Sequence, residues 1–159
     1  MSRRKETNYI VVHSTNTKSN VNVNIRMVDE WHRKKGLLKI GYHFFVKRSG
    51  KIEVGRNPNE IGAHTKDHDA DSVSICLAGG LNTRGVVSFD YSLKQLESLF
   101  ILIKTLKHIH PDAKVVGHKD LSETDCPSFD VGEWWLVNED NTGIKLKHKV
   151  GGSGVWVEN

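Results

Sequence analysis

The order of hydrophobic and polar positions predicts short strands alternating with helices along most of the chain. Runs of apolar, often β-branched residues bounded by polar or glycine-rich stretches are typical of strands buried in a sheet. The segment Arg48-Ser49-Gly50 separates two such runs and predicts a hairpin turn. The runs are found at 9–13, 42–47, 51–55, 73–78 and 114–117.

Three segments have the spacing of helices instead. The clearest begins after Ser92, because Ser92 and Gln95 have capping-box spacing and an apolar position then recurs every three or four residues. Those apolar positions are Leu96, Leu99, Phe100, Ile103 and Leu106. Residues 23–35 predict a second helix with one packed face, and the cap spacing of Asp130 and Glu133 predicts a short third helix.

The composition is that of an ordinary globular protein. A length of 159 residues is enough for one domain with a core, and 37% hydrophobic with 26% charged residues argues against disorder. The basic residues 3–5 imitate the start of a signal peptide, but the apolar run after them spans only 9–12. No window approaches the length of a membrane span. We therefore expect synthesis in the cytoplasm without a signal peptide.

Charge and cysteine content narrow the partners only in part. With 23 basic and 19 acidic side chains, the formal net charge of +4 favours an anionic partner such as nucleic acid, a lipid headgroup or a cell-wall polymer. Two cysteines do not make a disulfide framework, and one of them is a candidate metal ligand instead.

A candidate metal site comes from three residues near the ends of predicted strands. His118 follows the run 114–117, Cys126 closes the polar loop after it, and His13 ends the run that starts at Tyr9. Imidazole nitrogen and thiolate sulfur are good zinc ligands, and three protein ligands with one open position are typical of a catalytic zinc. Spacing alone leaves a second interpretation open, in which Cys126 is a buried apolar residue and the histidines only end their strands.

Six blocks of sequence, taken together and in this order, resemble the zinc-dependent N-acetylmuramoyl-L-alanine amidases. The blocks are YIVVHST at 9–15, GYHF at 41–44, GAH at 62–64, SVSICLAGG at 72–80, GH at 117–118 and CPSFD at 126–130. The small phage amidases are the most similar group, and the peptidoglycan-recognition proteins of animals share the same core. The resemblance runs from about Tyr9 to Trp135 and so covers most of the chain.

This resemblance implies an α/β fold: a single domain with a central mixed β-sheet flanked by helices, and one zinc ion per chain in a surface groove at strand ends. It places a catalytic domain at 9–138, after a basic lead-in at 1–8 and before a tail of unknown role at 139–159. The implied activity is hydrolysis of the amide bond between N-acetylmuramic acid and L-alanine in peptidoglycan. We expect a monomeric phage endolysin, made in the host cytoplasm, that reaches the cell wall after another component opens the membrane.

The resemblance also implies roles for single residues. The three candidate ligands above become the zinc ligands, Tyr42 matches the catalytic tyrosine of the family, and His64 matches a histidine that lines its substrate groove. Thr124 stands where phage members often have lysine and many peptidoglycan-recognition amidases have threonine. A neutral hydroxyl offers a hydrogen bond about half as strong as that of a charged group. We expect Thr124 to support catalysis with a different pH response.

Each of these residues also has a plainer interpretation. Tyr42 could be a core aromatic, Thr124 a loop residue that bonds its own backbone, and His64 a loop histidine. His43 should alternate away from Tyr42 on a strand, so we expect it to pack or to support the site rather than to bind metal. The remaining histidines on helix or tail patterns are expected to be exposed: His32, His108, His110 and His148.

Three other functions remain open at this point. A non-catalytic peptidoglycan-binding module is disfavoured by Cys126, because relatives that only bind typically lack the third ligand. A bacterial amidase of cell-wall recycling would use the same chemistry. Binding of nucleic acid or a polymerase has support only from the basic segments 3–5 and 145–149, which no aromatic platform accompanies, so we do not expect it as the primary role.

Overall fold

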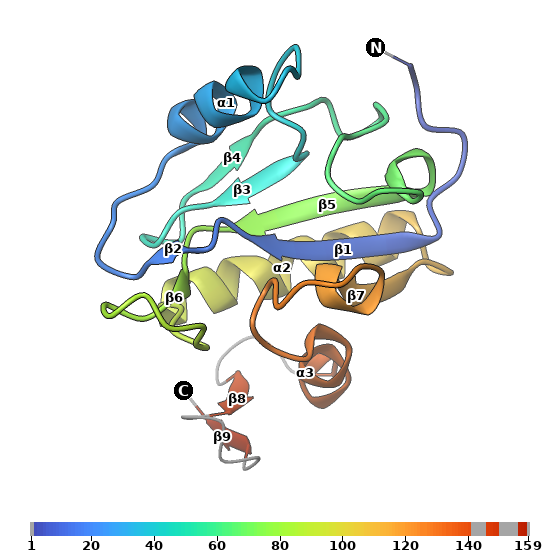
Figure 1. The fold of residues 1–159 in the computed structure, drawn as a ribbon. Coiled ribbons are helices and arrows are strands. Elements are labelled where there is room, and N and C mark those ends of the chain that lie inside the picture. Colours follow the sequence, from blue (N-terminus) through green and yellow to red (C-terminus); the bar gives the residue numbers. More distant parts are fainter. Residues whose placement is uncertain (1, 141–145, 150–155, 159) are drawn as a thin grey trace.

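The computed structural model describes residues 2–140, 146–149 and 156–158 and has a central sheet with helices on both faces (Figure 1). The strands of the sheet lie in the order β4-β3-β5-β1-β7. Four of them run parallel, and the edge strand β4 pairs antiparallel with β3, so the sheet is mixed, as the resemblance implies. Their bounds are β1 Tyr9–Ser14, β3 Phe44–Val46, β4 Ile52–Val54, β5 Ser72–Leu77 and β7 Lys114–Gly117.

The helices begin at polar capping residues. Helix α1 spans Ile25–Lys34 rather than 23–35, because the side chain of Asn24 accepts a hydrogen bond from Met27 N at 3.0 Å and so caps the first turn. Helix α2 spans Leu93–Ile109 and has the predicted capping box of Ser92 and Gln95. Helix α3, the predicted short helix, spans Val131–Asn138. The minor elements are β2 Thr17–Lys18, β6 Gly80–Leu81, β8 Lys147–Lys149, β9 Trp156–Glu158 and 3₁₀ turns at Asp69–Asp71 and His118–Asp120.

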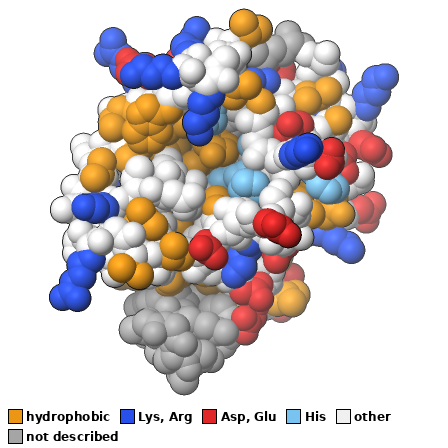
Figure 2. Space-filling view, in the orientation of Figure 1, with side chains coloured by type: hydrophobic (Ala, Val, Ile, Leu, Met, Phe, Trp, Pro, Cys, Tyr) orange, Lys and Arg blue, Asp and Glu red, His pale blue; other side chains and the backbone are white. Residues whose placement is uncertain are grey.

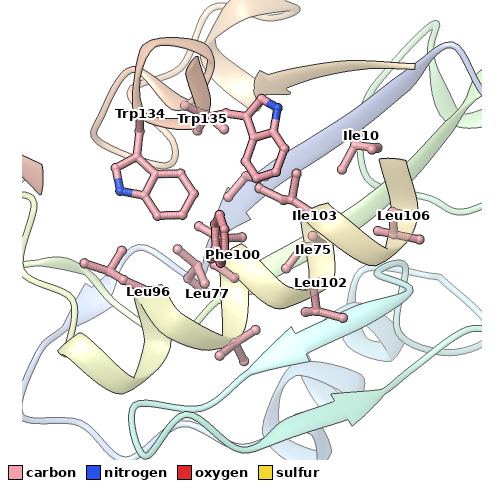
Figure 3. Close-up of a cluster of buried hydrophobic side chains, with 14 of the residues drawn as sticks. Ile10, Ile75, Leu77, Leu96, Phe100, Leu102, Ile103, Leu106, Trp134 and Trp135 are labelled. Carbon is pink, nitrogen blue, oxygen red and sulfur yellow. The ribbon is translucent and has the colours of Figure 1, made fainter. Parts of the chain in front are cut away.

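Alternation along β5 separates a hydrophobic face of the sheet from a face that carries polar groups. Val73, Ile75 and Leu77 pack with α2 and α3 in the main core, where Trp134 and Trp135 close the cluster (Figure 3). Because successive strand residues point to opposite faces, the intervening positions point away from this core. Those positions are Ser72, Ser74 and Cys76, and all are buried.

Helix α1 covers only part of the second face. It lies over β3 and β4 in Figure 1, and Val28 packs there with Phe45 and Cys76 in a smaller core. On the neighbouring strand β1, His13 lies opposite Cys76 in the parallel register and therefore points to this same face. The segments that precede β3, precede β5 and follow β7 place the rings of Tyr42, His64 and His118 next to that of His13.

Described residues of both terminal segments contact the rest of the domain. In the basic lead-in at 1–8, Arg4 is buried, and its guanidinium donates to the carbonyl of Glu60 at 3.1 Å. In the expected tail at 139–159, Leu146 is buried in the main core. The side chain of Asn138 pairs with the backbone of Lys147 through two hydrogen bonds of 2.6 and 2.9 Å. The glycine-rich segment 151–154 of this tail lies outside the described residues.

None of the helices among the described residues combines the length and the apolar character needed to cross a bilayer.

Candidate metal centre

The two predicted histidine ligands meet because the strands that precede them are neighbours. β1 and β7 run parallel with Val12 opposite Gly117, so the next residues, His13 and His118, lie side by side at the same end of the two strands. Their ring centroids are 4.4 Å apart. Cys126 comes from the loop after β7, and the donor atoms of the three residues all lie within 4.8 Å of one another, as a shared metal ion requires. Within the described ranges, no other group of three such side chains is this close.

The environment of the histidines keeps them in the form that binds metal. His13 is fully enclosed, and burial holds its pKa well below the ordinary value of 6.5, with smaller contributions from His64 and His118. Burial also lowers the pKa of His118, which is partly exposed. Both imidazoles are therefore neutral at pH 7, and each keeps a lone pair for a cation. Figure 2 shows histidine atoms at the surface near the middle of this face.

Ser14 presents two donors to the sulfur of Cys126. Its backbone N–H donates at 3.0 Å, and its hydroxyl lies 3.5 Å from the same atom. Burial raises the pKa of the Cys126 thiol, while the bonds from Ser14 act in the opposite direction. A bound cation would favour the thiolate. The donors of Ser14 are placed to stabilise that anion, so the donor set fits a soft divalent metal.

Neighbouring elements hold the loop that carries Cys126. The hydroxyl of Tyr91 donates to the carbonyl of Pro127, and the hydroxyl of Ser128 donates to the carbonyl of Ser88 at 2.8 Å. The ring of Phe129 lies 5.8 Å from the ring of Tyr91 in an edge-to-face contact. These contacts fix the backbone on the carboxyl side of Cys126 and thereby position its sulfur.

Tyr42 lies beside the candidate ligand cluster. Its ring centroid is 5.0 Å from that of His13. Burial raises its pKa well above the ordinary value of 10, and the sulfur atoms of Cys76 and Cys126 raise it further. The phenol therefore stays protonated at neutral pH and can donate a hydrogen bond.

Thr124 occupies the ligand loop and makes the local backbone bond that its plainer interpretation predicts. Its hydroxyl oxygen accepts from the backbone N–H of Cys126 at 3.2 Å. The side chain is partly exposed. A hydroxyl that accepts one hydrogen bond can still donate another, so this contact is compatible with a role toward substrate.

His64 lies in a different place from the one we expected. Its side chain has no exposed area, so it does not line an open groove in this structure. Instead its Nδ1 lies 2.9 Å from Nε2 of His13. The other ring nitrogen lies 3.1 Å from the hydroxyl of Ser72. No local sequence pattern indicates this contact, because it depends on how the loop after Gly62 folds back onto β5.

Two further histidines contact the groups around the centre. His32, which we expected to be exposed, is half-buried: its Nδ1 accepts from the backbone N–H of Gly41 at 2.8 Å, and its ring lies 5.1 Å from that of Tyr42. The one sequence feature that could have indicated this contact is the short distance along the chain between the end of α1 and Gly41. His43 is fully buried and bonded to Ser74, and it lies outside the ligand cluster, as expected.

Comparison with known proteins identifies the family. A family model described as N-acetylmuramoyl-L-alanine amidase matches residues 3–129. The chain belongs to this amidase family. An endolysin of Klebsiella phage KP32 is 36% identical to it over 138 residues, which cover 87% of this chain and 91% of that protein. The amidase is thus similar to a phage endolysin over almost its whole length.

Solved structures extend the likeness to the fold. The amidase is 30% identical to the N-acetylmuramoyl-L-alanine amidase LysC from Clostridium intestinale, with a TM-score of 0.69 over 79% of this chain and 78% of that one. Drosophila peptidoglycan-recognition protein LB has a TM-score of 0.70 over 91% of each chain at 22% identity, which shows a shared fold. The predicted resemblance to both groups is confirmed.

Proposed function

We propose that this chain is a zinc-dependent phage endolysin that hydrolyses the amide bond between N-acetylmuramic acid and L-alanine in peptidoglycan. The observation that carries the proposal is the convergence of His13, His118 and Cys126 at one edge of the sheet in a chain of the amidase family. Two neutral imidazoles and a thiolate are a donor set that zinc favours, and they leave one position open.

The three ligands would hold a single zinc ion, which when bound supplies a Lewis acid for the amide carbonyl and lowers the pKa of water. Tyr42 supplies a neutral donor beside the ligands, because its pKa is raised. We assign its phenol to the oxygen of the substrate carbonyl, where negative charge develops as the amide is attacked. Thr124 supplies a second hydroxyl on the ligand loop and assists in the same way.

A digestion of purified peptidoglycan tests the activity. The protein is incubated with sacculi, and the released fragments are identified by mass spectrometry. We expect free stem peptides that begin with L-alanine, together with glycan strands that keep intact sugars. Cleaved sugars or cleaved peptide cross-links would contradict the proposal. Co-sedimentation with sacculi but no release would favour the non-catalytic binding module instead.

The biological setting follows from the relatives. A curated protein that matches this chain over 91% of its own length is named an endolysin, which supports host lysis over cell-wall recycling. We propose that the chain acts as a monomer on the wall after synthesis in the host cytoplasm. Comparing intact sacculi with soluble muropeptides separates the two settings, because a lysis enzyme releases peptides from intact sacculi whereas a recycling enzyme prefers the soluble fragments.

A further inference from the structure

His13, one ligand of the proposed metal centre, is hydrogen-bonded through its Nε2 to a network of buried side chains. The Nε2 of His13 lies 2.9 Å from Nδ1 of His64, and Nε2 of His64 lies 3.1 Å from the hydroxyl oxygen of Ser72. That hydroxyl in turn donates to the backbone carbonyl of His68 at 2.6 Å. The network therefore runs from a proposed metal ligand, His13, to a backbone acceptor, the carbonyl of His68.

The carbonyl of His68, the last acceptor, fixes the direction of every hydrogen bond in this network. A carbonyl can only accept, so the single proton of the Ser72 hydroxyl is used on His68. The same hydroxyl must then accept from His64, which places the proton of that imidazole on Nε2. A neutral imidazole has one N–H, so Nδ1 of His64 is left as an acceptor facing His13. The network thus assigns a proton to Nε2 of His13.

The opposite assignment for His13 would be unfavourable. It would place two lone pairs 2.9 Å apart, one on each imidazole. The hydroxyl of Thr65 lies 3.2 Å from Nε2 of His13 and 2.8 Å from Nδ1 of His64. It can accept a hydrogen bond from Nε2 of His13 and donate one to Nδ1 of His64, and both imidazoles then keep their proton on Nε2. Burial of both imidazoles makes an unmatched pair of lone pairs costly.

We propose that His64 and Ser72 are positioning residues that fix the tautomer of His13 and so present its Nδ1 lone pair to the metal. This inference rests on the proposed zinc site and adds two residues to it. Metal-bound histidines in proteins usually donate their other N–H to a fixed acceptor, which orients the ring and raises its basicity. Here the acceptor is itself an imidazole, whose own proton is fixed by Ser72.

The surrounding loop and strand hold this hydrogen-bonded network in place. Asp69 accepts from the backbone N–H groups of His64 and Thr65, each at 2.8 Å, and so anchors the loop. At Gly62 a Cβ atom would come within 2.6 Å of the His64 ring, so only glycine leaves room for that ring. Ser72 begins β5, and its neighbour in the sheet register is Tyr9 at the start of β1. His64 and Ser72 are therefore held in place by parts of the fold other than the metal ligands.

Nitrogen-15 NMR of the histidine rings tests the assignment without a variant. The protonated and bare nitrogens of a neutral imidazole have well-separated shifts, so the spectrum reports which nitrogen carries the proton. In the metal-free chain at pH 7.5, we expect the proton on Nε2 in both His13 and His64. Added zinc should shift Nδ1 of His13. A proton on Nδ1 of either residue would overturn the inference.

Zinc affinity, measured by competition with a chromogenic chelator, tests the consequence. Ser72→Ala removes the acceptor of His64, and we expect the dissociation constant for zinc to rise about tenfold, as for other outer partners of metal ligands. Ser74→Ala is the matched control, because Ser74 is equally buried on the same strand but bonds His43 instead. Equal affinities for the two variants would overturn the inference. A wild-type chain that binds no zinc would instead refute the proposed function, and the NMR result would still decide the tautomers.

Discussion

Tyr42 places a hydrogen-bond donor beside the candidate metal centre, and its phenol stays protonated because burial raises its pKa. In Tyr42→Phe the ring can keep its contacts with His13 and His32, while the hydroxyl is lost. We expect full zinc content and a turnover number lower by about 10²-fold, the typical effect of losing one donor to a developing oxyanion. Turnover on peptidoglycan and bound zinc are measured on the same sample. Unchanged turnover would mean that Tyr42 only packs.

His43 should make stability depend on pH. Burial lowers its pKa to about 4, although its bond to the Glu60 carbonyl opposes the shift. The backbone N–H of Ser74 donates to Nδ1 at 3.0 Å, which requires the neutral ring. Above pH 6.5 neither the folded nor the unfolded state binds the proton, so the stability is complete. As the pH falls from 6.5 to about 4, only the unfolded state binds it, and about 3 kcal/mol is lost.

A variant separates this effect from those of the other histidines. His43→Gln keeps a donor and an acceptor but does not titrate, so its free energy of unfolding should fall less steeply over the same pH range. Urea unfolding at several pH values measures both proteins. Parallel pH curves for the two would contradict the assignment.

The residues of the centre differ in how far the sequence could predict them. The convergence of His13, His118 and Cys126 could be predicted, because each ends a strand or closes a loop within a family block. The inward position of His64 could not, since it depends on a hydrogen bond to His13, 51 residues away in the chain. Ser72 looked like an ordinary strand residue for the same reason. Roles that depend on long-range packing have no local signal.

At the scale of elements, the ligand loop depends on the segment that precedes α2. Tyr91→Phe removes the donor to Pro127 but keeps the ring among its aromatic neighbours. We expect a loss of about 1 kcal/mol in the free energy of unfolding, the usual net value of one hydrogen bond. We also expect weaker zinc binding, because the loop that carries Cys126 is held less firmly. Calorimetry with and without zinc measures both, and an unchanged affinity would show that the bond does not position the sulfur.

The strands and helices themselves were largely predictable from local pattern. The capping box at Ser92 placed the start of α2, and the hairpin around Ser49 joins β3 to β4 as predicted. The start of α1 was placed two residues too early, because Val23 continues the apolar pattern although Asn24 is the cap. Val23 packs in the smaller core from outside the helix. Hydrophobic spacing alone does not distinguish an apolar residue inside a helix from one that lies just before the capping residue.

At the scale of the whole molecule, the folded unit extends beyond the boundary at residue 138 that we took from the resemblance. Leu146 is 1% exposed and belongs to the main core. We expect Leu146→Ala to lower the free energy of unfolding by about 2–5 kcal/mol, the range for such truncations in a core. Leu136→Ala is the control, because Leu136 is 69% exposed and should cost less than about 0.5 kcal/mol. Equal losses in urea unfolding would contradict this extension.

The polarity of the chain did not indicate this packing. Alternating lysines around Leu146 are typical of an exposed strand or a basic tail. The burial of Leu146 follows from the side chain of Asn138, which pairs with the backbone of Lys147 and brings the segment back onto α3. A resemblance that ends near Trp135 carries no information about that contact.

The central claim is that one metal ion, held by His13, His118 and Cys126, is needed to cut the bond to L-alanine. The most direct test is to remove bound metal with a chelator and to follow stem-peptide release as zinc is added back. We predict no release from the metal-free chain and a rise that ends at one zinc per chain, with no recovery in Cys126→Ser. Full release by metal-free protein, or full recovery in Cys126→Ser, would contradict the account.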